Sequence, residues 1–174
     1  MAITSKVVED LDTLKAVSHP LRMQLLGALR RRGPSTASEL ARDLGESSGS
    51  TSYHLRQLER FGFVSDDDEQ PSGRERRWKA LHDQTEFPSA LANLDGGREY
   101  LDVVRRRQEE HLREGLERWT EHRPGIGHSD YLLRLDPDDL EALLRDLEDV
   151  ISRYAETTGS EPIALHVLTL PGPA

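Results

Sequence analysis

The 174 residues suffice for one ordinary domain or two small ones, each with a buried core. The chain has no cysteine, which excludes disulfides, thiolate metal sites and thiol catalysis. It shows neither a secretory signal pattern nor an apolar run of membrane-spanning length, so we expect a soluble, cytoplasmic protein with no membrane partner. Residues 18–82 carry eleven Lys and Arg against nine Asp and Glu, a net charge of +2, whereas residues 83–174 carry ten against twenty, a net charge of −10.

Two helices are predicted at the N-terminal end. Residues 1–17 carry apolar side chains at mostly helical spacing, and Ser18–Pro20 then interrupts the pattern. Pro20 suits the first turn of a second helix, which Gly33-Pro34 ends. Arg30–Arg32 lie at the C-terminal end of this helix, where they favour the helix dipole; contact with phosphate is the less favoured alternative. The two apolar stripes are Val7, Val8, Leu11, Leu14 and Val17, then Leu21, Leu25, Leu26 and Leu29.

The next segment has the pattern of a helix-turn-helix. A short helix is predicted over Ser38–Leu44, and Gly45 ends it because glycine accepts a positive φ without steric cost. Ser47, Ser48 or Ser50 can each cap the following helix, which runs to Gly62. Two helices joined by a short turn that contains glycine are typical of this motif.

The second of these helices has two distinct faces. Thr51, Leu55 and Leu58 fall on one side, and the opposite side is polar. Hydroxyls, amides and arginines on one face suit contact with base edges and phosphates in a DNA major groove, although a merely solvated face is the alternative. His54 borders the apolar side, where it either packs between helix and hairpin or contacts DNA, and Glu59 would be repelled by phosphate.

A basic hairpin follows the helix. Phe63-Val64 begin one strand, Asp66–Gly73 are predicted as a turn, and Arg74–Leu81 form the returning strand. A hairpin after a recognition helix is a wing, and the basic residues of its second strand suit contact with phosphates or with a minor groove. The acidic run Asp66–Glu69 either faces solvent or pairs with neighbouring arginines.

The acidic half is predicted to contain two helical stretches, the first at Ala90–Leu94 and a long one over residues 101–119. The apolar stripe of the long helix favours a dimer seam over an intramolecular core. Tyr131–Leu135 is predicted as a strand, Pro137–Tyr154 as a helix and Ile163–Leu170 as a buried strand, which together make a small β-α-β unit. This unit is a dimerisation module, an effector-sensing module or a packing extension of the first domain.

The segment from residue 10 to residue 82 resembles the ArsR-type winged helix-turn-helix regulators. The motifs that carry the resemblance are Ser18–Arg22, Glu39–Ala41, Thr51–Leu55 with Leu58, and Gly62–Val64. The resemblance implies a dimeric transcriptional repressor that binds a near-palindromic operator. Family members that sense metals use cysteines on the first helix of the motif or an Asp/His set on the dimer helix. Arg42–Leu44 offers no cysteine, and Asp102, His111, Glu114 and His122 do not reproduce the second set, so we expect no metal and no cofactor.

The sequence therefore predicts a mainly α protein with a small β content, an α+β fold. Residues 1–82 form a winged helix-turn-helix DNA-binding domain, and residues 83–174 form a helical dimerisation and C-terminal α+β region. We expect a homodimeric repressor of transcription that binds double-stranded DNA at an inverted repeat, responds to an unknown small-molecule or protein effector and has no catalytic residues. The alternative is a winged-helix module for protein–protein interaction. The predicted DNA contacts are Ser48, Gly49, Ser50, Ser52, Tyr53, Arg56, Gln57, Arg60, Arg74, Arg76 and Arg77.

Overall fold

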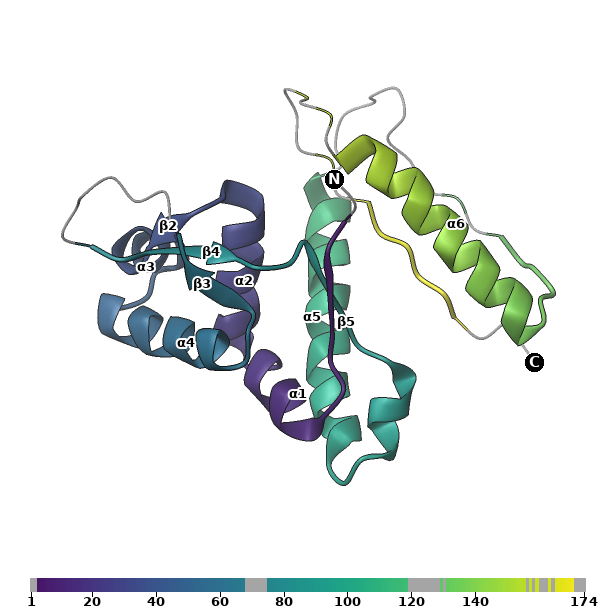
Figure 1. Ribbon diagram of the computed structural model, residues 1–174, viewed down its shortest axis with the longest axis horizontal. Coiled ribbons are helices and arrows are strands. Elements are labelled where there is room, and N and C mark those ends of the chain that lie inside the picture. The colour runs from purple at the N-terminus through teal and green to yellow at the C-terminus, as the bar shows by residue number, and fades with distance from the viewer. Residues whose placement is uncertain are drawn as a thin grey trace. The chain divides into compact units, whose positions relative to one another are not determined.

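The computed structural model describes residues 3–67, 75–118, 129, 131–155, 157, 159, 163 and 165–170. The chain divides into two compact units, one of residues 4–107 and one of residues 1–3 together with residues 108–174. Helices dominate both, and the strands are few and short (Figure 1). The predicted fold class, mainly α with a small β content, is confirmed. The functional boundary predicted after residue 82 stays a prediction, because compactness alone does not define function.

Four helices build the first part of the unit of residues 4–107. They are α1 (Leu11–Val17), α2 (Pro20–Arg32), α3 (Ala37–Leu44) and α4 (Ser48–Arg60). Pro20 is the first residue of α2, as predicted, and the ring Nδ1 of His19 accepts a hydrogen bond from the Leu21 N–H at 3.2 Å. This bond satisfies one of the free N–H groups at the start of the helix.

The first predicted helix is shorter than its apolar pattern suggested. Ser5–Val7 forms strand β1, which pairs in parallel with β5 (Gln84–Glu86). The Asp10 carboxylate accepts from the Thr13 N–H at 2.8 Å and so caps α1 at Leu11. Val8 is fully buried in the core although it lies outside the helix. The helix prediction over residues 1–17 was therefore wrong at its start, where apolar residues belong to a strand and a loop.

The turn between α3 and α4 has the predicted geometry. Thr36 and Glu39 form a reciprocal capping box at the start of α3, with bonds of 2.7 and 3.1 Å. Gly45 ends α3 with φ of 69°, a left-handed conformation that favours glycine. Ser47 then accepts from the Ser50 N–H and caps α4. These caps fix where both helices of the motif begin and end.

The wing is part of a three-stranded antiparallel sheet with the order β2-β4-β3. The strands are β2 (Ser35–Thr36), β3 (Val64–Asp66) and β4 (Arg77–Ala80), and Asp66 lies opposite Trp78. The two strands of the hairpin were predicted, whereas β2 was not, because two residues carry no readable alternation. Most of the predicted turn, residues 68–73, lies outside the described residues, and so does Arg74, the first residue of the predicted returning strand.

The core joins the helices to the sheet. Leu25 of α2, Leu40 of α3 and Leu55 of α4 are fully buried, and Trp78 of β4 is 2% exposed. Contacts of α4 with α2, α3 and β3 hold it within this unit (Figure 1). The predicted apolar face of α4 is confirmed, since Thr51, Leu55 and Leu58 all have an exposed fraction of 0%.

The described part of the chain after β5 contains three helical segments, with the predicted break between the first two. A 3₁₀ turn at Ser89–Asn93 precedes α5 (Gly97–Arg118), and α6 covers Pro137–Ala155. Val104 of α5 joins the core of the unit of residues 4–107. Part of the stripe predicted as a dimer seam is therefore used within the chain.

The two predicted strands beside α6 are corrected. Residues 131–136 and 165–170 form no strand, whereas the helix predicted between them is confirmed. Tyr131 and Leu170 are 82% and 76% exposed, so these apolar runs are not the buried strands that their composition indicated. A strand needs a neighbour to take its backbone hydrogen bonds, and an apolar run by itself does not supply one. Among the described residues, no helix is long and apolar enough to cross a membrane.

Candidate nucleic-acid interface

The polar face of α4 is available at the surface. Tyr53 is 56% exposed, and Ser48, Gly49, Arg56 and Arg60 are also exposed. Ser50, Ser52 and Gln57 are half-buried. The buried side of the same helix is fixed in the core, so the exposed side chains are presented from a rigid element.

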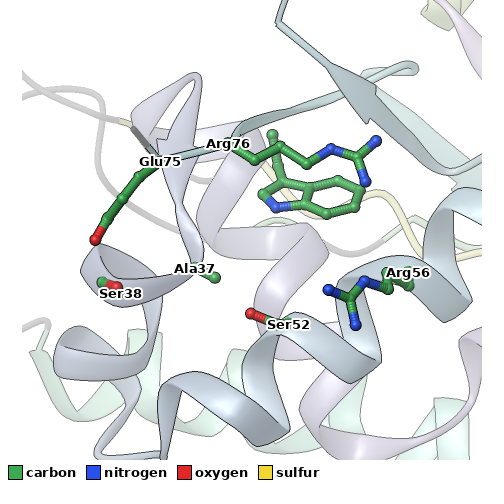
Figure 2. Close-up of a pocket in the computed structure, with 7 residues that line it drawn as sticks. Ala37, Ser38, Ser52, Arg56, Glu75 and Arg76 are labelled. Carbon is green, nitrogen blue, oxygen red and sulfur yellow. The ribbon is translucent and has the colours of Figure 1, made fainter. Parts of the chain in front are cut away.

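Ser52 and Arg56 face a groove between α4, the start of α3 and the wing. Its volume is about 190 Å³, and Figure 2 shows both residues on the side of α4 that faces Ala37, Ser38 and Arg76. Glu75 and Trp78 complete the lining. The sequence analysis did not predict Ser38 and Trp78 as residues of this groove. Ser38 could have been found from its place in the first turn of α3, two residues after the capping Thr36.

Gln57 and Arg60 lie along a different groove. That groove has a volume of about 300 Å³ and lies beside α1 and α2, with Lys15 and Arg22 among its other lining residues. The predicted contact residues of α4 therefore divide between two grooves, one on the wing side and one on the α1–α2 side. Tyr53 lines neither groove.

Arg56 is an unpaired cation among the residues that the structure describes. It makes no hydrogen bond and no ion pair with any of them. Its five N–H donors are therefore available to a ligand, and a planar guanidinium suits bidentate recognition of a guanine edge or a phosphate. The side chain is thus placed to bind a partner that lies across α4.

The described cations of the wing, unlike Arg56, are paired with acidic side chains. Arg76 pairs with Glu59 at 2.5 Å and with Asp66. Arg77 lies 3.8 Å from Glu39 and donates to the carbonyl oxygen of Pro34. Lys79 lies 3.9 Å from Asp67. Of the two interpretations of the acidic run, pairing with a neighbouring arginine is the one found for Asp66, whereas Asp67 pairs with a lysine.

The arginine run at the end of α2 is mainly structural. Arg30 donates to the His82 carbonyl oxygen at 2.9 Å and to the Thr85 hydroxyl at 2.8 Å, and burial lowers the pKa of Arg30 to about 10. Arg32 pairs with Asp43 of α3. These contacts tie α2 to the segment after β4 and to α3, which fits the structural interpretation of this run.

His54 contacts the start of α2. Its ring centroid lies 4.4 Å from that of His19, and its Nδ1 is buried without a hydrogen-bond partner in the described part of the chain. Burial lowers the pKa of both rings, and Arg22 lowers each further, while Glu46 raises that of His54. Of the two roles predicted for His54, packing and DNA contact, the structure shows a packing contact, and the partner that it gives is His19 at the start of α2.

Acid is expected to destabilise this unit from near neutral pH. A histidine whose pKa is lowered by folding binds its proton more weakly than in the unfolded chain. The stability that this histidine gives to the folded unit is complete above its unfolded pKa of 6.5. That stability is lost as the pH falls through and below this value. We expect the temperature at the midpoint of unfolding to decrease as the pH is lowered from about 7 to about 5.5. The His19→Asn/His54→Gln variant is expected to show a smaller decrease. Asparagine is used at position 19 because it can cap the helix as His19 does.

Calorimetry over this pH range measures the effect, and His166→Gln, an exposed histidine of the other unit, is the matched control. The lowered pKa values of Asp10, Glu39 and Asp83 arise mainly from hydrogen bonds to threonines and act only in stronger acid. An equal fall in the wild type and the double variant would show that the histidine pair does not set this pH dependence.

The described residues contain no group of three or more His, Asp or Glu side chains that would hold a metal ion. The exposed polar side of α4 and the two grooves beside it are the candidate site. Comparison with curated proteins finds no match. The sequence model of a family described as "Helix-turn-helix domain" matches residues 17–66.

Several solved structures are similar to part of the chain. The transcriptional repressor BigR from Xylella fastidiosa is 24% identical, with 41% of this chain and 68% of that chain covered and a TM-score of 0.35. The homodimeric winged helix-turn-helix DNA-binding domain Mb0332 from Mycobacterium bovis is 20% identical over 64% and 85% of the two chains, with a TM-score of 0.38. The ArsR family transcriptional regulator RHA00566 is 25% identical over 64% and 96%, with a TM-score of 0.35. With α3, α4 and the hairpin in place, residues 17–66 form a helix-turn-helix domain that continues into a wing, and this part of the chain resembles the ArsR-type winged helix-turn-helix regulators.

Proposed function

We propose that this protein is a sequence-specific DNA-binding regulator of transcription, a homodimeric repressor that reads an inverted repeat. The observation that carries the proposal is α4, whose apolar side is fully buried while its polar side presents Tyr53 and Arg56, the latter without a described partner. A rigid helix that projects hydroxyl, amide and guanidinium groups matches the donor and acceptor pattern of a major groove.

Each part of the α4 surface has an assigned role. Arg56 and Tyr53 read base edges, while Ser50, Ser52, Gln57 and Arg60 support them through base or phosphate contacts. Ser48 and Gly49 lie in the first turn of α4, where backbone N–H groups favour phosphate. Arg77 of the wing lies beside the flanking DNA backbone in this proposal, and Arg74, which lies outside the described residues, stays a contact predicted from the sequence.

The dimer is proposed from surface that the chain itself leaves uncovered. No described residue of α6 is buried, and Leu144, Val150 and Tyr154 are 40%, 41% and 68% exposed. Exposed apolar side chains on one helix suit a contact with a second copy of the chain. A two-fold dimer would place two copies of α4 in successive major grooves, about 34 Å apart, which requires an inverted repeat in the DNA. The acidic C-terminal region is the place we assign to dimerisation or to an effector.

The wing also favours a second candidate, a module for protein–protein interaction. Its described cations Arg76, Arg77 and Lys79 are paired with acidic residues, which weakens their attraction for phosphate. The two candidates differ in their response to salt. DNA binding weakens steeply as salt rises because counterions are released, whereas an apolar protein interface is much less sensitive.

The test is selection from sheared genomic DNA by the purified protein of 174 residues, with sequencing of what stays bound at moderate salt. Enrichment of a short inverted repeat, with binding that weakens as salt rises, is the expected result. A folded dimer that enriches no sequence at any salt concentration would contradict the proposal and favour the interaction module.

A further inference from the structure

Arg76 is held by two carboxylates from different elements. Its guanidinium donates to the Glu59 Oε1 at 2.5 Å and to the Asp66 Oδ2 at 2.8 Å, and its Nε donates to Asp66 as well. The same group lies 3.8 Å from the ring centroid of Trp78. The hydrogen bond that Arg76 donates to Asp66 is the main cause that raises the pKa of Arg76. Bidentate pairing and stacking together fix the position of a side chain that is otherwise flexible.

The residues of this clasp, which we define as Glu59, Asp66 and Arg76, come from three places in the fold. Glu59 lies in the last turn of α4, Asp66 ends β3, and Arg76 directly precedes β4. The clasp therefore joins the proposed recognition helix to both strands of the wing. It also contains two acidic groups and one basic group, so its net charge is negative at neutral pH.

We propose that Arg76 is a positioning residue and not a DNA contact. Glu59 and Asp66 hold its guanidinium against Trp78, and these contacts fix the position of the wing relative to α4. The same contacts keep this cation from binding phosphate. This inference rests on the proposed DNA-binding function. It assigns a role to Glu59, the residue of α4 that phosphate would repel.

The energetic argument concerns what Arg76 would have to give up. Transfer to a phosphate would break two charge-assisted pairings and leave two carboxylates facing a polyanion. Each pair is partly exposed, with side chains 38–49% accessible, and contributes little to stability alone. Arg76 would nevertheless gain one phosphate contact and leave two carboxylates unpaired, which is unfavourable. Arg56, which has no described partner, loses nothing comparable when it binds.

The salt dependence of DNA binding tests this role. When the logarithm of the binding constant is plotted against the logarithm of salt concentration, each phosphate that the protein neutralises adds about 0.9 to the steepness of the slope. Glu59→Gln/Asp66→Asn releases Arg76, so we expect tighter binding to a duplex of unrelated sequence and a slope steeper by about 0.9. The triple variant with Arg76→Gln removes the released cation and is expected to return the slope to the wild-type value.

Two further variants separate a held arginine from an arginine that binds phosphate. Arg76→Gln alone is expected to leave the slope unchanged, whereas Arg56→Gln makes it shallower by about 0.9 if Arg56 binds phosphate. A shallower slope in Arg76→Gln, or an unchanged slope in Glu59→Gln/Asp66→Asn, would overturn the inference.

Amide hydrogen exchange tests the positioning role in the absence of DNA. We expect faster exchange in β3 and β4 of Glu59→Gln/Asp66→Asn, with α1 and α2 unchanged, because only the wing loses an attachment. Unchanged exchange in the wing would reject the clasp even if the wild type binds DNA. A wild type that binds no DNA while its double variant shows the faster exchange would instead reject the proposed function and keep the clasp.

Discussion

Leu55→Ala is expected to lower the free energy of unfolding of the unit of residues 4–107 by about 2–5 kcal/mol. Leu55 has an exposed fraction of 0% and lies in the cluster that also contains Leu25 of α2, Leu40 of α3 and Trp78 of β4. Removal of its side chain loses the transfer free energy of the apolar groups and leaves a cavity among elements that close only partly around it. Urea denaturation followed by circular dichroism measures the change.

The neighbouring residue provides the control for this experiment. Arg56→Ala changes the exposed side of the same helix and is expected to shift stability by no more than about 0.5 kcal/mol. Helix propensity favours alanine at both positions, so propensity does not explain a large difference between them. Similar stabilities for the two variants would show that α4 does not pack through Leu55.

The opposed faces of α4 are what sequence periodicity predicts best. Thirteen residues with a repeat of about 3.6 residues and a serine cap leave little choice of structure or of buried side. The same logic placed α2, α3 and α6, and glycine with a left-handed φ ended α3 at Gly45.

Short strands and isolated apolar runs are where the sequence is ambiguous. Ser5–Val7 and Ser35–Thr36 pair with distant strands, and nothing in their own letters specifies the partner. The reverse error occurs at residues 131–135 and 165–170, where composition alone indicated strands. In both cases the structure depends on a partner that is far away in the sequence.

The candidate site shows the same limit. Helical spacing placed the contact residues of α4 on one polar side, but it does not distinguish a free arginine from a paired one. Arg56 and Arg76 were both predicted as DNA contacts from the sequence, and only the fold brings Glu59 and Asp66 to Arg76. The sequence offered pairing of the acidic run with arginines as one of two alternatives, but it does not choose partners that are ten or seventeen residues apart.

Arg56→Gln is expected to weaken binding to the selected inverted repeat by about 5- to 150-fold, the value of one good bidentate contact of about 1–3 kcal/mol. The guanidinium has no described partner to release, and it lies on the wing-side groove beside Ser52. Fluorescence anisotropy with the repeat and with a scrambled duplex measures the affinity and the preference between them. Arg113→Gln on α5, an exposed arginine paired with Glu117, is the matched control and is expected to bind as the wild type does.

Arg56→Lys separates reading from simple attraction. Lysine keeps the charge but not the planar fork, so phosphate binding would survive this change in large part, whereas a bidentate base contact would not. We therefore expect Arg56→Lys to keep the salt dependence of the wild type and to lose most of the preference for the repeat over the scrambled duplex. Full preference in Arg56→Lys would assign Arg56 to the DNA backbone. Unchanged affinity and preference in Arg56→Gln would remove it from the interface.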